Sequence, residues 1–344
     1  MSEARLRSDP APLLRLVEGM HAVEMVIAAV GWLELFDRLS AEPLAPDALG
    51  LELGIADRPA DVLVTLCQAL GLLDIGTDGL LRPSETATEF LTTASPWSMV
   101  PCYAALKERP PCRDLLAVLR TGRPAGGPPG DEGDRPDWFT SMGEEDFAHV
   151  FLQATDSRSA GLARLFADRL RPGAKIRLLD VAGGSGLFSC ALAERIPDLT
   201  ATVLEQEPVA GIAKRSVAAR GLGDRVTVHT GDMFGGPLPL GYDAHLLSNV
   251  VHDWPPAKIV DIFAACHRAL PPGGTLHVHE AFLDDDKAGP LSVAEYSVLL
   301  LMFTEGHCYS KREITDLLVA AGFAGFEYLP TTAGRGILSA RRVS

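Results

Sequence analysis

From residue 171 onward, short apolar runs alternate with segments of helical character, and this alternation is the strongest constraint on the fold. We expect strands over 176–181, 200–204, 225–229, 243–248 and 275–280. We expect helices between them, over 187–195, 209–220 and 256–270. Strands separated by helical crossovers are typical of an α/β fold with a doubly wound, largely parallel sheet.

Polar residues follow four of these strands at the point where each strand ends. They are Glu205, Asp232, His252 and Glu280. In open α/β sheets, ligands bind beyond the carboxyl ends of the strands. The four side chains therefore predict a ligand site at this edge.

A glycine-rich loop, Ala-Gly-Gly-Ser-Gly over 182–186, follows the first strand. It fits the dinucleotide pattern G-x-G-x-x-G poorly, and the sequence has no phosphate-binding G-x-x-x-x-G-K-[ST] loop. Glu205, at the end of the second strand, suits the two hydroxyls of a ribose. Nicotinamide dinucleotides and S-adenosylmethionine both meet that description, so both stay open at this point.

The loop Asp232-Met233-Phe234 offers an acceptor for an adenine amino group and two apolar faces for its ring, although an ordinary turn would look the same. His252 is a candidate general base, or else a structural histidine beside the following helix. Glu280 is placed to orient its imidazole. His277 and His279 precede Glu280, and we expect them to serve packing rather than metal binding.

The first hundred residues are predicted to be helical. A helix over residues 13–39 would be apolar on nearly every face. A predicted helix over 58–70 precedes a predicted hairpin with its turn at 77–79. This order is that of a winged helix, yet its second helix has one basic residue and the chain has a net charge of −14. We therefore expect pairing of two chains rather than binding of nucleic acid. A Pro- and Gly-rich stretch over 109–136 predicts a connector, which divides the chain into domains 1–105 and 106–344.

Compartment signals are negative. The first twelve residues have no apolar core like that of a secretion signal, and the apolar stretches 25–33 and 298–303 are too short to span a bilayer. The six cysteines form no Cys-x-x-Cys pair, so we expect buried thiols and neither a zinc site nor a disulfide framework. A cytoplasmic protein without membrane contact is predicted.

Three motifs together resemble one family. They are Leu-Leu-Asp-Val-Ala-Gly-Gly-Ser-Gly over 178–186, Gly-Asp-Met-Phe over 231–234 and Val-His-Asp-Trp over 251–254. The sequence resembles the class I S-adenosylmethionine-dependent O-methyltransferases, in the branch of the caffeic acid, bacterial polyketide and acetylserotonin enzymes. The resemblance covers nearly the whole chain and implies a Rossmann-like catalytic domain, an N-terminal helical winged-helix dimerisation domain and a homodimer.

The resemblance also implies roles for individual residues. His252 would take the proton of a small aromatic substrate, and Glu280 would flank it. Residues implied to contact S-adenosylmethionine are Gly183, Gly184, Gly186, Glu205, Asp232, Met233, Phe234, Ser248, Phe151 and Thr155.

The sequence departs from the family pattern at three positions. Ala182 stands where the glycine run often begins, and Ser248 stands where a lysine is frequent. In the segment Gly-x-Glu-Arg-Thr the carboxylate that brackets the base is replaced by Cys308. The Cys308 departure keeps methylation of carbon or nitrogen open beside O-methylation. Two further alternatives are a winged-helix regulator that senses the cofactor and a dehydrogenase.

Overall fold

The computed structural model describes residues 7–125, 138–173 and 176–343. Contacts divide the chain into two compact units, each built from separate parts of the sequence. The sheet unit comprises residues 1–14, 138–282 and 311–344, and the helical unit comprises residues 15–137 and 283–310. The helix α1 (Ala11–Glu18) spans the first boundary between them.

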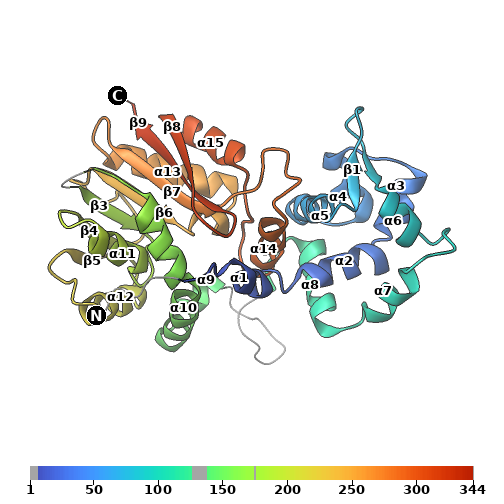
Figure 1. Cartoon of the computed structure of the whole chain (residues 1–344), viewed down its shortest axis with the longest axis horizontal. Helices are drawn as coiled ribbons and strands as arrows, with labels where there is room; N and C mark the ends of the chain where they lie inside the picture. The colour runs from blue at the N-terminus through green and yellow to red at the C-terminus, as the bar shows by residue number, and fades with distance from the viewer. Residues whose placement is uncertain (1–6, 126–137, 174–175, 344) are drawn as a thin grey trace. The chain divides into compact units, whose positions relative to one another are not determined.

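The sheet unit is a seven-stranded sheet with helices on both faces (Figure 1). Its elements are α9 (Trp138–Ser141), α10 (Glu145–Arg169), β3 (Arg177–Val181), α11 (Leu187–Arg195), β4 (Thr200–Glu205), α12 (Val209–Ala219), β5 (Val226–Thr230), β6 (Ala244–Ser248), the 3₁₀ turn η2 (Val251–Asp253), α13 (Pro256–Ala269), β7 (Thr275–Ala281), α15 (Lys311–Ala320), β8 (Phe323–Pro330) and β9 (Arg335–Arg342). The predicted α/β fold is confirmed, and α11 has the predicted limits.

The strand order is β5-β4-β3-β6-β7-β9-β8. The first five of these strands are mutually parallel, while β9 pairs antiparallel with both β7 and β8. The chain proceeds outward from β3 in one direction and from β6 in the other, so the order reverses between β3 and β6. Ligand crevices of doubly wound sheets open at such a reversal. The strands β8 and β9 were absent from the sequence prediction.

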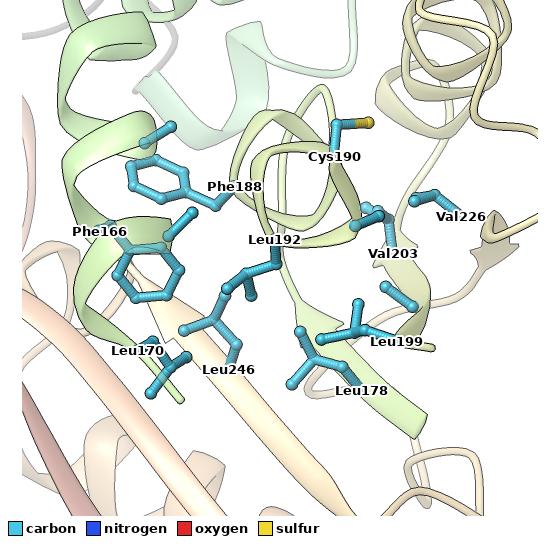
Figure 2. Packing of buried hydrophobic residues seen from close by; sticks show 14 of the residues in the cluster. Phe166, Leu170, Leu178, Phe188, Cys190, Leu192, Leu199, Val203, Val226 and Leu246 are labelled. Atoms are coloured by element: carbon cyan, nitrogen blue, oxygen red, sulfur yellow. The ribbon is translucent and has the colours of Figure 1, made fainter. Parts of the chain in front are cut away.

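The core on one face of the sheet is packed by α10, α11 and α12. Phe166 of α10 contacts Phe188 of α11 edge to face, with ring centroids 5.4 Å apart. Leu178, Val203 and Leu246 meet these helices from three neighbouring strands, as Figure 2 shows. This apolar layer fixes the strand ends, and with them the loops that bear the polar residues.

The helical unit comprises most of the N-terminal helices and one late helix. Its elements are α2 (Ala22–Gly31), α3 (Leu35–Ala41), the 3₁₀ turn η1 (Pro46–Ala48), α4 (Leu49–Leu53), α5 (Asp57–Ala69), β1 (Leu73–Ile75), β2 (Leu81–Pro83), α6 (Glu85–Phe90), α7 (Val100–Leu106), α8 (Pro110–Thr121) and α14 (Leu291–Phe303). The predicted hairpin is present as β1 and β2, after the predicted helix. Residues 13–39 form three helices where the sequence suggested one continuous apolar segment.

The late helix α14 packs on α5 and α2, far from it in sequence. The Arg58 guanidinium donates to the carbonyls of Thr304 and Gly306 at 2.9 and 2.6 Å, and Lys287 pairs with Asp61 at 2.9 Å. These contacts assign residues 283–310 to the helical unit, whereas the sequence predicted one boundary near residue 105. The connector predicted over 109–136 begins with α8, and its part from 126 on lies outside the described residues.

Two further expectations concern cysteine and membrane contact. Five of the six free cysteines are buried as predicted, but Cys102 is exposed. Among the described residues, no helix combines the length and the apolar character that crossing a membrane requires.

Candidate active site

The glycine loop lies at the reversal of strand order, directly after β3. The carboxyl group of Asp180 is fully buried beneath it, and Ser189 Oγ donates to Asp180 Oδ2 at 2.6 Å. A Cβ atom on Gly183 would lie 2.5 Å from the Asp180 carboxyl carbon, so only glycine fits there. Ala182 adopts φ +54°. This left-handed conformation is one that glycine adopts with less strain than alanine.

Glu205 closes the loop from β4. Its Oε1 accepts from the Gly184 backbone N–H at 2.8 Å, and its Oε2 accepts from the Gln206 N–H at 3.2 Å. Burial, with a smaller effect from the nearby Asp180, raises the pKa of Glu205 to about 7, although the two backbone hydrogen bonds act in the opposite direction. Burial likewise raises the pKa of Asp180 to about 7. Asp180 Oδ1 is buried and has no hydrogen-bond partner among the described residues. A buried carboxyl group, Asp180, and a half-buried one, Glu205, thus share this corner, a surrounding that favours a cation or hydrogen-bond donors.

The loop after β5 presents polar and aromatic groups. Asp232 Oδ1 accepts from the Phe234 N–H at 2.9 Å, which fixes the turn. The ring of Phe234 is 37% exposed and meets the ring of Trp254 edge to face, with centroids 4.9 Å apart. Asp232 is exposed and Met233 is half-buried. Two aromatic rings from different loops therefore lie beside the predicted adenine-binding residues.

His252 lies in η2, after β6, and is 5% exposed. Its Nδ1 is 2.6 Å from Glu280 Oε2 on β7, while Glu280 Oε1 accepts from the N–H groups of Val250 and Val251 at 2.8 and 2.9 Å. Burial alone would lower the pKa of His252. The charges of Glu280 and Asp253 outweigh burial, so the pKa lies above its ordinary value of 6.5.

Asp253 lies on the other side of the imidazole. Its Oδ1 is 3.5 Å from His252 Nε2, and its side chain is 17% exposed. Burial raises the pKa of Asp253 to about 6, against the opposing effect of the positive charges on His252 and Arg158. Sequence reasoning missed this carboxylate, although its place directly after His252 was the available signal.

The two histidines of β7 make hydrogen bonds within the sheet unit. His277 bonds Ser339 at 2.8 Å, and His279 Nδ1 bonds Ser248 Oγ at 2.9 Å. The ring of His279 packs 4.7 Å from that of Phe166. Burial lowers the pKa of His277 to about 4 and that of His279 to about 3, so both are neutral. No cluster of His, Cys, Asp or Glu suited to a metal ion occurs within the described part of the chain.

The two predicted residues of α10 lie one helical turn apart. Thr155 Oγ1 donates to the backbone carbonyls of Phe151 and Leu152 at 3.0 and 3.1 Å. Phe151 is half-buried, and its ring lies 6.1 Å from that of Phe147. Leu152 of the same helix would be 3.4 Å from a Cβ on Gly184. This part of α10 therefore borders the glycine loop.

Comparison with known proteins identifies the family. The model of the O-methyltransferase domain matches residues 137–324, more than half of the chain. The chain belongs to the O-methyltransferase family. It is 33% identical over 325 residues to 3-hydroxy-5-methyl-1-naphthoate 3-O-methyltransferase of Streptomyces sahachiroi, covering 91% of this chain and 89% of that protein.

Solved structures agree with this assignment. A family 2 O-methyltransferase from Planctomyces limnophilus, in complex with apigenin, aligns with TM-score 0.88 and 30% identity, over 99% of this chain and 98% of that one. Human N-acetylserotonin methyltransferase in complex with SAM aligns with TM-score 0.59 and 26% identity over the full length of both chains. The protein is thus an S-adenosylmethionine-dependent O-methyltransferase of the secondary-metabolite type, as the sequence motifs predicted.

The residues of the methyltransferase fit this cofactor. S-adenosylmethionine carries a sulfonium and an ammonium, and the buried Asp180 and the half-buried Glu205 offer acceptors for positive or hydrogen-bond-donating groups. The pyrophosphate of a dinucleotide would instead add negative charge beside two carboxyl groups. The electrostatics of the glycine loop therefore agree with the family's cofactor.

Proposed function

We propose that this methyltransferase acts on a hydroxyl group of a small aromatic or polyketide-like secondary metabolite, with His252 as general base. The observation that supports the proposal most is the buried His252–Glu280 pair at the end of β6, with its 2.6 Å contact. A naphthoate and apigenin in the names of similar proteins support an aromatic acceptor.

In this mechanism Glu280 holds the base in one orientation. The two backbone N–H groups anchor one carboxylate oxygen, and the other accepts from His252 Nδ1–H, which leaves Nε2 as the basic atom. S-adenosylmethionine supplies an electrophilic methyl group when bound. The substrate O–H proton would pass to Nε2 while the oxygen electron pair formed the new bond to the methyl carbon. The carbon–sulfur bond of the cofactor would break in the same step, and its electron pair would go to sulfur.

The base and the alignment of the substrate contribute to the rate by different amounts. A phenol of pKa about 10 and an ordinary imidazole of pKa about 6.5 differ by about 3.5 units, or roughly 4.8 kcal/mol for full proton transfer. The raised pKa of His252 makes this difference smaller. The base therefore acts as the methyl group moves and contributes about 10²–10⁴-fold. Alignment of the oxygen with the methyl group contributes about 7–11 kcal/mol, so positioning is the larger effect.

We assign the cofactor contacts along the edge of the sheet. Glu205 binds the ribose, Asp232 and Met233 bind the adenine beside Phe234, and the glycine loop receives the methionine end. The residues proposed to line the methionine end and the sulfonium are Gly183, Gly184, Gly186, Ser248, Phe151 and Thr155.

Incubation with isotopically labelled S-adenosylmethionine and a panel of phenols, aromatic amino acids and polyketides tests the reaction. We expect label in the product of a phenolic or polyketide acceptor, attached to oxygen when the product is fragmented by mass spectrometry. Label on carbon or nitrogen would overturn the O-methylation proposal in favour of the alternative left open by Cys308. A matched acceptor with its hydroxyl already methylated serves as the control and should take up no label.

We further propose that two chains pair through an apolar face of the helical unit. The face is formed by four exposed side chains: Leu16 (74%), Val17 (52%), Met20 (55%) and Val23 (58%). Exposed apolar side chains that are close together in the sequence are typical of an interface rather than of a free surface.

Light scattering tests the pairing. The double variant with Leu16→Glu and Met20→Glu would bury two charges per chain in an apolar contact. We expect the dissociation constant of the dimer to rise about a hundredfold or more. Leu51→Glu is the control, since Leu51 is 90% exposed on α4 and should leave the mass unchanged. A wild-type monomer, or a dimer that survives both charges, would contradict the proposal.

A further inference from the structure

The imidazole of His252 has a carboxylate on each side within the sheet unit. Glu280 of β7 lies 2.6 Å from Nδ1, and Asp253 of η2 lies 3.5 Å from Nε2. The first contact is a hydrogen bond that fixes the ring. The second places a negative oxygen on the side of the nitrogen that receives the substrate proton.

Two arginines also act on the charges of this group. Arg335 of β9 is 3% exposed, and its positive charge lowers the pKa of His252, opposing the two carboxylates. Arg158 of α10 acts on Asp253 and lowers the pKa of that carboxyl group. The carboxylates outweigh Arg335 and burial, since the net shift of the His252 pKa is upward.

The sequence supplies a reason for a second carboxylate within the sheet unit. The resemblance described for the sequence implies a second carboxylate beside the base at the position where this chain has Cys308. Cys308 is uncharged as a thiol and fully buried. A base flanked by Glu280 alone would have to balance burial and the charge of Arg335 with one carboxylate.

We propose that Asp253 is a second positioning carboxylate of His252, which stabilises the imidazolium formed when Nε2 takes the substrate proton. The inference rests on the proposed role of His252 as the base. With Nδ1–H donated to Glu280, the neutral imidazole directs its Nε2 lone pair toward the side of Asp253, and proton uptake converts repulsion into attraction. The effect requires an ionised Asp253, and a pKa of about 6 leaves it ionised above neutral pH.

The test compares Asp253→Asn with Asp253→Glu and with the control Asp261→Asn, which removes an exposed carboxylate from α13. NMR titration of the His252 ring in the S-adenosylhomocysteine complex reports its pKa without turnover, with the signal assigned by its loss in His252→Ala. The pH profile of kcat/KM reports the base in action.

In Asp253→Asn we expect the pKa of His252 to fall by about 1–3 units, because an opposite charge within about 4–6 Å is removed. The midpoint of the acid limb of the kcat/KM profile should move to lower pH by the same amount. We expect kcat at the optimum to fall about tenfold, with an unchanged KM for S-adenosylmethionine. Asp253→Glu should restore part of both shifts, and Asp261→Asn should show neither. An unchanged His252 pKa in Asp253→Asn would overturn the inference.

The two proposals fail in distinguishable ways. A His252 pKa that falls in Asp253→Asn while the kcat/KM profile stays in place would support the charge coupling and reject His252 as the base. Loss of turnover in His252→Ala combined with an unshifted profile in Asp253→Asn would keep the base and reject Asp253.

Discussion

Replacing His252 by alanine is expected to lower kcat by about 10²–10⁴-fold while S-adenosylhomocysteine affinity stays within about twofold of wild type. The change removes the proposed proton acceptor, whereas the assigned cofactor contacts belong to other residues. Single-turnover kinetics and calorimetry measure the two quantities separately. His149→Ala, which removes an exposed histidine from α10, is the control and should retain full turnover.

The wild-type enzyme should also show the protonation of this base. Because the pKa of His252 is raised, its imidazole becomes protonated, on lowering the pH, at a higher pH than a free histidine does. Turnover should therefore fall as the pH falls through a value above 6.5. A variant His252→Ala that keeps kcat within about threefold of wild type would reject the base assignment.

Gly183→Ala is expected to weaken cofactor binding at least about tenfold and to destabilise the fold by about 1–3 kcal/mol. The new Cβ would lie 2.5 Å from the Asp180 carboxyl carbon and 2.6 and 2.8 Å from its oxygens. Asp180 is fully buried and bonded to Ser189, so the glycine loop must shift to make room. Calorimetry with S-adenosylhomocysteine measures the affinity, and thermal unfolding should show a Tm lower by roughly 2–12 °C.

Gly223→Ala provides the matched control for this substitution. A Cβ on Gly223 would meet no atom within 4 Å, and its backbone lies outside the left-handed region. The control should keep both the Tm and the affinity. If Gly183→Ala bound S-adenosylhomocysteine as tightly as the control, the glycine loop would not contact the cofactor as proposed.

Local sequence pattern was sufficient for the parallel half of the sheet. Each of the five predicted strands is present within two residues of its expected limits, because apolar runs ending at glycine or acidic residues are a local signal. The strands β8 and β9 were missed. Their place depends on the antiparallel pairing of β9 with β7, which joins residues about sixty positions apart and which no short window reveals.

Prediction of the site had a similar limit. Strand ends identified Glu205, His252 and Glu280, and the structure brings His252 and Glu280 together as predicted. Three other features depend on side-chain geometry and burial, which the sequence does not give. They are the contact of Glu205 with the Gly184 N–H, the buried carboxyl group of Asp180 and the approach of Asp253 to Nε2 of His252. The two-unit division was likewise beyond the sequence, since α14 packs on α5 from more than two hundred residues away.

That packing has a consequence for synthesis of the chain on the ribosome. The helices up to α8 emerge early, but the residues that bind Arg58 and Asp61 follow only after most of the sheet unit has been translated. At about 5–20 residues per second the delay is roughly 10–40 s. During that interval the apolar surface of α5 that packs against α14 is exposed to solvent. We therefore expect chaperones that recognise exposed apolar segments to bind the nascent N-terminal region. A fragment that ends at α8 would keep this surface exposed permanently.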